Sequence, residues 1–181
     1  MTRTLPAWII LLTLLLAACG VAVIVPTCNV EPLDQFPVDS VVIETHGRSY
    51  PFKVWVADTV NRRSQGLMYV SRLDADRGML FLFDKPTRPS MWMKNMAIPI
   101  DLLFISADGR IITVARNATP DSTITIQSDD VVTGVIELAG GTATRLHLET
   151  GAQISHAHFV RLAKQTLPSP EKSSPLRTAR N

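Results

Sequence analysis

Short apolar runs separated by turn residues recur along the middle of the chain, and they constrain its fold more than any other feature. Met79–Phe83 and Leu102–Ile105 are continuous apolar runs, each too short for a helix, so we expect buried strands there. Asp108-Gly109, the pair most typical of a tight hairpin, lies between the second run and Ile111–Val114. These runs predict paired strands.

The remaining expected elements are also short. Val41–Glu44 and Tyr50–Val56 flank a turn and predict a hairpin. Asp58 or Thr59 can cap a short helix that Gly66 ends. We expect a loop over 84–89, strands over 123–127, 131–138 and 152–163, and a helical turn between the last two. About eight short strands with one or two short helices predict a mainly β fold, a compact antiparallel sandwich or barrel-like domain.

The N-terminal segment is apolar and differs from the rest of the chain. Leu5–Val25 carries no charge and is about long enough to cross a bilayer as a helix, and Arg3 before it favours export of the domain on its C-terminal side. Leu16-Ala17-Ala18-Cys19-Gly20 resembles a bacterial lipobox, in which the signal peptide is removed and Cys19 is lipidated. An uncleaved signal anchor is the alternative, because Val21–Val25 stays apolar. Both interpretations predict a membrane-anchored, extracytoplasmic domain in the bacterial periplasm or cell envelope.

The chain is expected to have four segments. Residues 1–28 form the signal peptide with its lipobox or the membrane anchor, 29–40 a linker, 41–163 the β domain and 164–181 a disordered tail. A net charge of only +2, without a concentrated basic stripe, argues against nucleic acid as a partner. Both cysteines, Cys19 and Cys28, precede the domain, which excludes a disulfide framework, a thiolate zinc site and a cysteine nucleophile within it.

Five sequence blocks occur in order within the expected domain. They are Arg63-x-x-Gly66-Leu67-Met68, Gly78-Met79-Leu80-Phe81-x-Phe83, Trp92-Met93-Lys94-Asn95, Ile98-Pro99-Ile100-Asp101-x-Leu103-Phe104 and Val135-Ile136-Glu137-Leu138-x-x-Gly141. Together they resemble the DUF192 family, also called UPF0127, over roughly Val41 to Phe159. The resemblance implies a mainly β, sandwich-like domain in a small prokaryotic protein, often exported or membrane-associated. It implies no reaction, because the family is one of unknown function.

Polar residues within or beside the apolar runs form one candidate ligand-binding site. Buried charges need partners, so these side chains are expected to converge. In one cleft, Arg63, Lys94 and Asn95 would bind an anionic or polar ligand beside the apolar wall of Trp92. Asp101 or Glu137 would orient them. A structural ion-pair network is the alternative.

Methionine is the other unusual feature, because five of the six methionines lie in the domain. Thioether sulfur suits Cu(I) or Ag(I), and a neighbouring indole face can sit over a cation. Met91, Met93 and Met96 are the candidate ligands, with core packing as the alternative. If this segment is extended, Met91 and Met93 share one face, and Trp92 and Lys94 share the other.

Two histidines, His156 and His158, would share one face of the last expected strand. This spacing is a weak metal signal, and a solvated edge strand is the alternative interpretation.

The sequence therefore favours a non-enzymatic domain that binds a small molecule or a partner protein, without a cofactor. Cu(I) or Ag(I) binding is one alternative. An undescribed enzyme that uses Asp101 and Glu137 for acid–base chemistry is another. The sequence contains no phosphate loop, G-x-S-x-G elbow or H-E-x-x-H motif.

Overall fold

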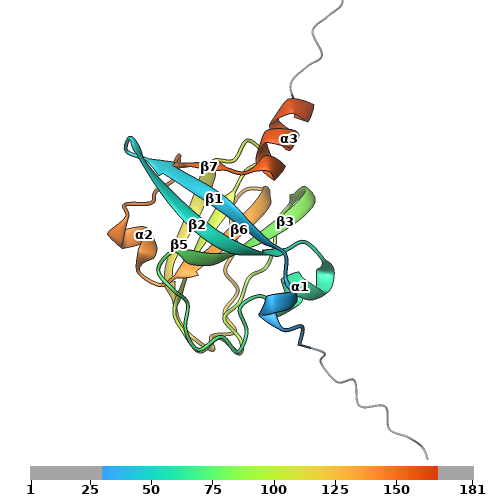
Figure 1. Ribbon diagram of the computed structural model, residues 1–181, viewed down its shortest axis with the longest axis vertical. Helices are drawn as coiled ribbons and strands as arrows, with labels where there is room; N and C mark the ends of the chain where they lie inside the picture. The colour runs from blue at the N-terminus through green and yellow to red at the C-terminus, as the bar shows by residue number, and fades with distance from the viewer. Residues whose placement is uncertain (1–29, 167–181) are drawn as a thin grey trace, which may run out of the picture. The chain divides into compact units, whose positions relative to one another are not determined.

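The computed structural model describes residues 30–166, which fold around one curled sheet of seven strands with short helices beside it (Figure 1). The strands are β1 (Val38–Thr45), β2 (Arg48–Ala57), β3 (Arg77–Thr87), β4 (Ile100–Ile105), β5 (Ile111–Ala118), β6 (Val132–Ala139) and β7 (Gln153–Ser155). The helices are the 3-10 helix η1 (Leu33–Gln35) and the α-helices α1 (Val60–Gln65), α2 (Thr142–Arg145) and α3 (Ala157–Thr166). The predicted mainly β, barrel-like class is confirmed.

The anchor, both cysteines and most of the tail lie outside the described residues. Among residues 30–166, no helix combines the length and the apolar character needed to cross a membrane.

The strand order is β5-β4-β6-β3-β2-β1-β7, and neighbours are antiparallel except for the parallel pair β2–β3. The two edge strands meet at one end of the sheet. There an isolated antiparallel β-bridge joins Arg110 to Gln153. Next to it, Ile111 N donates to Ala152 O at 2.9 Å, and Gly151 N donates to Ile111 O at 2.8 Å. The sheet therefore curls until its edges touch, which satisfies edge groups that an open sheet leaves unpaired.

Local sequence signals account for the turns and for α1. β1 and β2 form the expected hairpin, and the turn with Asp108-Gly109 joins β4 to β5. The side chain of Thr59 accepts a hydrogen bond from Arg62 N at 3.2 Å and so caps α1. Gly66 ends α1 with a positive φ of 52°.

Three expected elements differ in the structure. β3 continues to Thr87, so the expected loop over 84–89 begins later. Residues 123–127 alternate like a strand, but only Ile126 finds a partner, in a single bridge to Met91. The expected strand over 152–163 divides into β7 and α3, because Phe159 packs into the core from a helix.

The sheet buries a separate apolar cluster on each of its faces. Leu103 and Ile136 belong to the first cluster, which α2 and α3 cover. Leu102 and Val135, their neighbours in sequence, belong to the second cluster. Successive side chains of a strand point to opposite faces, so this alternation follows from the strand geometry. The second face also packs on the segment that follows α1 and on residues 91–96.

Candidate functional site

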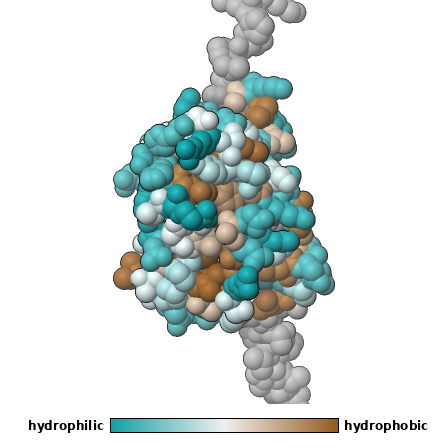
Figure 2. All heavy atoms as spheres, turned by 60° about the vertical axis from the view of Figure 1, so that its left-hand side comes forward, coloured by the Kyte–Doolittle hydropathy of each residue, from teal (hydrophilic) through white to brown (hydrophobic). Residues whose placement is uncertain are grey.

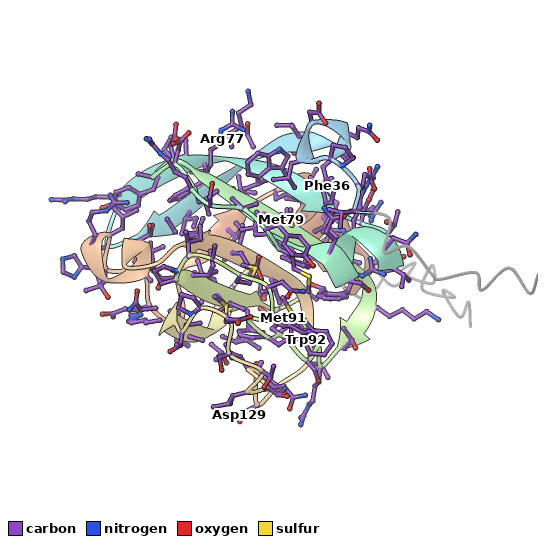
Figure 3. The ribbon with its side chains drawn as sticks, turned by 90° about the horizontal axis from the view of Figure 1, so that it is seen from below. Phe36, Arg77, Met79, Met91, Trp92 and Asp129 are labelled. Atoms are coloured by element: carbon purple, nitrogen blue, oxygen red, sulfur yellow. The ribbon has the colours of Figure 1, made fainter. Side chains whose placement is uncertain are left out.

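A pocket of about 250 Å³ opens on the second face of the sheet, between α1 and residues 89–96. Figure 3 shows α1 between Phe36 on one side and Met91 and Trp92 on the other. α1 and the turn after it supply one wall, the segment with Met91 and Trp92 supplies the facing wall, and β6 supplies Glu137. The lining is mainly apolar, which favours a ligand with substantial apolar surface.

Glu137 is the most unusual side chain of this pocket. It is only 3% exposed, and its Oε2 has no hydrogen-bond partner among the described residues. Burial raises the pKa of this carboxyl to about 8, so it is mostly protonated at neutral pH. A protonated carboxyl is a hydrogen-bond donor as well as an acceptor. Glu137 therefore offers a neutral donor to an acceptor atom in the pocket.

Gly66 lies directly over this carboxyl. A Cβ at that position would be 3.2 Å from Phe81 Cζ and 3.9 Å from Glu137 Oε2. The glycine provides the positive φ that ends α1, and its missing side chain leaves room beside the carboxyl.

Arg63 holds a positive charge in the wall of the pocket. Its Nη1 donates to Asp58 O at 2.7 Å and to Leu82 O at 3.0 Å, and its guanidinium lies 5.4 Å from the centre of the Phe83 ring. These contacts fix its position without neutralising it, since no carboxylate within residues 30–166 forms a salt bridge with Arg63. An anionic group entering the pocket would find a fixed cation.

Asp101 faces away from the pocket. In the β4–β6 pair, Asp101 lies opposite Leu138 and Leu102 lies opposite Glu137, so the two carboxyl groups project from opposite faces of the sheet. Asp101 is fully buried. Its two oxygens accept hydrogen bonds from Asn117 N at 2.6 Å and Ala143 N at 2.7 Å, which tie β5 and α2 to β4. The expected convergence of Asp101 with Glu137 is therefore wrong.

Lys94 and Asn95 also lie outside the lining. Lys94 is exposed. Asn95 has a positive φ of 60°, its N–H donates to Asp121 Oδ1 at 3.0 Å, and its Nδ2 lies 3.8 Å from the sulfur of Met68, behind the pocket wall. Of the six residues expected around one cleft, the structure brings together Arg63, Trp92 and Glu137. Within the described residues, none of the six forms a salt bridge, so the ion-pair network is not observed there either.

The methionines divide into two groups. Met68, Met91 and Met96 line the pocket, whereas Met79 and Met93 are fully buried in the second cluster outside the lining. The expected alternation is observed, since Met91 and Met93 are buried while Trp92 and Lys94 are exposed. The expected set of three sulfurs is wrong in one member, because Met68 takes the place of Met93.

The two histidines do not form an exposed strand face. His156 Nε2 lies 3.1 Å from Asp39 Oδ2, and His158 is 6% exposed at the start of α3 with its Nδ1 3.3 Å from Arg161 Nη2. The interpretation as a solvated edge strand is therefore wrong. No cluster of three or more His, Cys, Asp or Glu side chains suited to a metal ion occurs in residues 30–166.

Sequence reasoning missed several lining residues, chiefly Met68, Phe81 and Phe83. The sequence signal that could have identified these lining residues is the set of five blocks, because four of the blocks meet at the pocket. Only the block with Asp101 contributes no lining residue.

Solved structures of two bacterial proteins are similar to this chain. One, from Sinorhizobium meliloti 1021, is described as a candidate transcription regulator. It has 39% sequence identity, covers 66% of this chain and 94% of its own, and gives a TM-score of 0.65. The other is a protein of unknown function from Novosphingobium aromaticivorans DSM 12444. It has 28% identity, covers 70% of this chain and 91% of its own, and gives a TM-score of 0.67.

No curated protein is significantly similar to the chain. The sequence model of DUF192, described as an uncharacterised ACR, matches residues 41–156, a range that contains every residue lining the pocket. The chain therefore belongs to the DUF192 family.

Proposed function

We propose that this chain is a membrane-tethered, extracytoplasmic binding module that holds a small molecule in the pocket beneath α1. The observation that carries the proposal is Glu137. A buried, protonated carboxyl with an unpartnered oxygen is costly to a fold, and a ligand acceptor atom would satisfy it. Because Glu137 lies in an apolar pocket, ligand binding would explain why the fold keeps this unfavourable group.

The lining also indicates the chemical class of the ligand. Thioether and aromatic side chains such as Met91, Phe81 and Trp92 favour an apolar body. Glu137 supplies a donor for a carbonyl or carboxyl oxygen, and Arg63 supplies a cation at the wall. The expected ligand is a small, mainly apolar molecule with one carbonyl or carboxylate group.

The tether and the location are supported by the N-terminal sequence. The uncharged stretch Leu5–Val25, preceded by Arg3, would anchor the chain as a helix, or lipidation of Cys19 would anchor it after cleavage. Intact mass separates the two, because cleavage before Cys19 removes eighteen residues and lipidation adds acyl mass.

Catalysis is not part of the proposal, because Asp101 and Glu137 project from opposite faces and cannot act on the same bond. The role of transcription regulator, which the description of the Sinorhizobium protein names, is not carried over to this chain. A net charge of only +2 does not supply the electrostatic attraction that nucleic acid requires.

NMR of the full chain in detergent micelles, with ¹³C-labelled methionine methyl groups, tests the binding proposal. Phenylacetamide has an apolar ring and a carbonyl acceptor, and ethylbenzene lacks the acceptor. Phenylacetamide should shift Met68, Met91 and Met96 and leave Met79 and Met93 unchanged. Glu137→Leu should weaken phenylacetamide binding while ethylbenzene binding persists. Equal shifts of all five domain methionines, or none, would contradict a ligand in this pocket.

A second candidate function is favoured by the placement of Met68, Met91 and Met96 in one pocket with Trp92. Three thioethers beside an indole suit Cu(I) or Ag(I). Anaerobic Cu(I) titration should quench Trp fluorescence and shift the same three methyl signals. Met91→Leu should weaken this response, and Met93→Leu is the matched control because Met93 is buried outside the lining. An unchanged response in Met91→Leu would exclude this candidate.

A further inference from the structure

The N-terminal segment enters the domain at a fixed point on α1. Glu31 N donates to Gln65 Oε1 at 2.7 Å, and Gln65 Nε2 donates back to Glu31 O at 2.7 Å. The Glu31 carboxylate also forms a salt bridge with Arg62, with 2.8 Å between Nη2 and Oε1. Gln65 itself lines the pocket. The chain therefore leaves the domain beside the pocket mouth.

The same mouth is surrounded by large exposed apolar side chains. Val60 is 70% exposed and Trp92 is 49% exposed, and both belong to the pocket wall. Tyr69, 63% exposed, follows the lining residue Met68, and Ile124, 77% exposed, lies two residues before the bridge between Ile126 and Met91. We call Val60, Tyr69, Trp92 and Ile124 the apolar rim. Trp and Tyr are the side chains most enriched where a protein meets the membrane interface.

One other face of the domain has a different composition. The face around α2 mixes hydrophobic and hydrophilic side chains (Figure 2). At the rim, Lys94 and Arg88 are exposed and form no salt bridge within residues 30–166. Acidic side chains lie on this side as well, since Asp121 accepts a hydrogen bond from Asn95 N and Figure 3 shows Asp129 on the same side of the domain as Trp92. The surface is therefore mixed in charge, and the aromatic and aliphatic side chains of the rim are what favours contact with a lipid interface.

The length of chain between anchor and domain is short. Five residues lie between Val25, the end of the apolar stretch, and Glu31, and the six Cα–Cα steps from Val25 to Glu31 reach about 20 Å at most when extended. If Cys19 carries the lipid, the limit is about 40 Å. A tether of either length, attached at Glu31 beside α1, would allow the rim to reach the membrane.

We propose that the apolar rim docks on the lipid bilayer that holds the N-terminal segment, so that the pocket opens at the membrane surface and receives its ligand from the lipid interface. This inference rests on the proposed function, because it requires the tether. It adds a second contact with the membrane and specifies an amphipathic ligand that partitions into lipid.

Fluorescence quenching by brominated phospholipid tests the docking. The full chain is placed in vesicles of phosphatidylcholine and phosphatidylglycerol, with Trp92 as the only tryptophan through Trp8→Phe and Trp55→Phe. The control keeps Trp55 alone through Trp8→Phe and Trp92→Phe. Trp55 packs 5.2 Å from the Arg77 guanidinium, and Figure 3 shows Arg77 and Trp92 at opposite edges of the domain. Trp92 emission should shift to shorter wavelength and be quenched, while Trp55 emission should change little.

A rim variant sharpens the test. Val60→Asp together with Ile124→Asp places charges on exposed positions of the rim, and it should reduce the quenching of Trp92 without releasing the chain from the vesicles. If Trp92 is not quenched while the chain sediments with the vesicles, the docking is wrong and the tether stands. If the chain does not sediment with the vesicles, both are wrong. Pocket binding is measured separately by the methionine signals, so its failure is distinguishable from either result.

Discussion

Glu137 makes the stability of this domain depend on pH in an unusual direction. Burial raises its pKa to about 8, whereas the unfolded chain releases the same proton near pH 4.5. Between these two values the folded state binds more protons than the unfolded state. The free energy of unfolding therefore falls as pH rises through this range, and it is unaffected by Glu137 below it.

Replacing Glu137 with Gln should remove this contribution, because the amide has nearly the same shape and does not ionise. Variant and wild type should have similar stability at pH 5. At pH 9 the variant should be more stable, by at most about 5 kcal/mol if the full shift in pKa is expressed. Urea denaturation at pH 5, 7 and 9 measures the difference. A difference that stays constant with pH would show that Glu137 is not protonated in the fold.

Asp101 should affect stability and leave the pocket unchanged. Asp101→Ala removes the acceptor for Asn117 N and Ala143 N, and two charge-assisted hydrogen bonds in a buried site correspond to about 3 kcal/mol or more. Asp101→Asn keeps one acceptor oxygen and should cost less. Denaturation midpoints check both values. The shifts of Met68 and Met91 with phenylacetamide should persist, and their loss would contradict the assignment of Asp101 to the other face.

The residue types of the site could be predicted from the sequence, but the face from which each side chain projects could not. Arg63, Trp92 and Glu137 are polar or aromatic side chains within apolar blocks, and the structure brings them together as that pattern predicts. Asp101 met the same criterion but faces the other way. A one-residue difference in register reverses the face of a side chain, and the register between β4 and β6 depends on residues far apart in the sequence.

At the scale of elements, features fixed by local interactions were predictable. α1 begins where Thr59 caps it and ends where Gly66 provides a positive φ, and both signals are adjacent to the helix. Residues 123–127 have the composition of a strand, yet their backbone finds only the single bridge at Ile126. A strand needs a partner as well as propensity, and partners are not a local property.

Gly66 and Gly47 form a matched pair for testing the pocket wall. Both have positive φ, 52° and 70°, so alanine should strain the backbone at each by about 1 kcal/mol or more. Only at Gly66 would the added Cβ approach Phe81 and Glu137; at Gly47 nothing lies within 4 Å. Gly66→Ala should therefore weaken phenylacetamide binding, and Gly47→Ala should not. Methionine methyl shifts check this, and equal effects would mean that backbone strain alone is responsible.

At the scale of the whole molecule, the fold class could be predicted from the sequence, but the topology of the sheet could not. Short apolar runs correctly indicated a mainly β, barrel-like domain. The parallel pair β2–β3 was not foreseen, because its connection contains only the six-residue α1 and no long amphipathic helix. The closure of the sheet by Ile111, Gly151 and Ala152 depends on contacts between distant segments. The connection between β2 and β3 carries α1 and brings Gly66, at its end, next to Glu137.

The barrel-like core extends beyond the segment that defines the family. The DUF192 match ends at residue 156, but Phe159 in α3 is 1% exposed and belongs to the first apolar cluster. Its ring fills the space beside Gly134, where an added Cβ would lie 2.7 Å from Phe159 Cζ. α3 is therefore expected to seal one side of this core as an integral part of the fold.

Phe159→Ala should destabilise the domain by about 3–5 kcal/mol, because it removes a buried aromatic ring and leaves a cavity under α3. Val160→Ala is the matched control, since Val160 is the next residue of the same helix and is 51% exposed. Its effect should stay within about 0.5 kcal/mol. Urea denaturation of both variants measures the difference. Equal stabilities would mean that α3 rests on the surface, whereas the expected difference would make the helix part of the core that holds β6, and with it Glu137, in place.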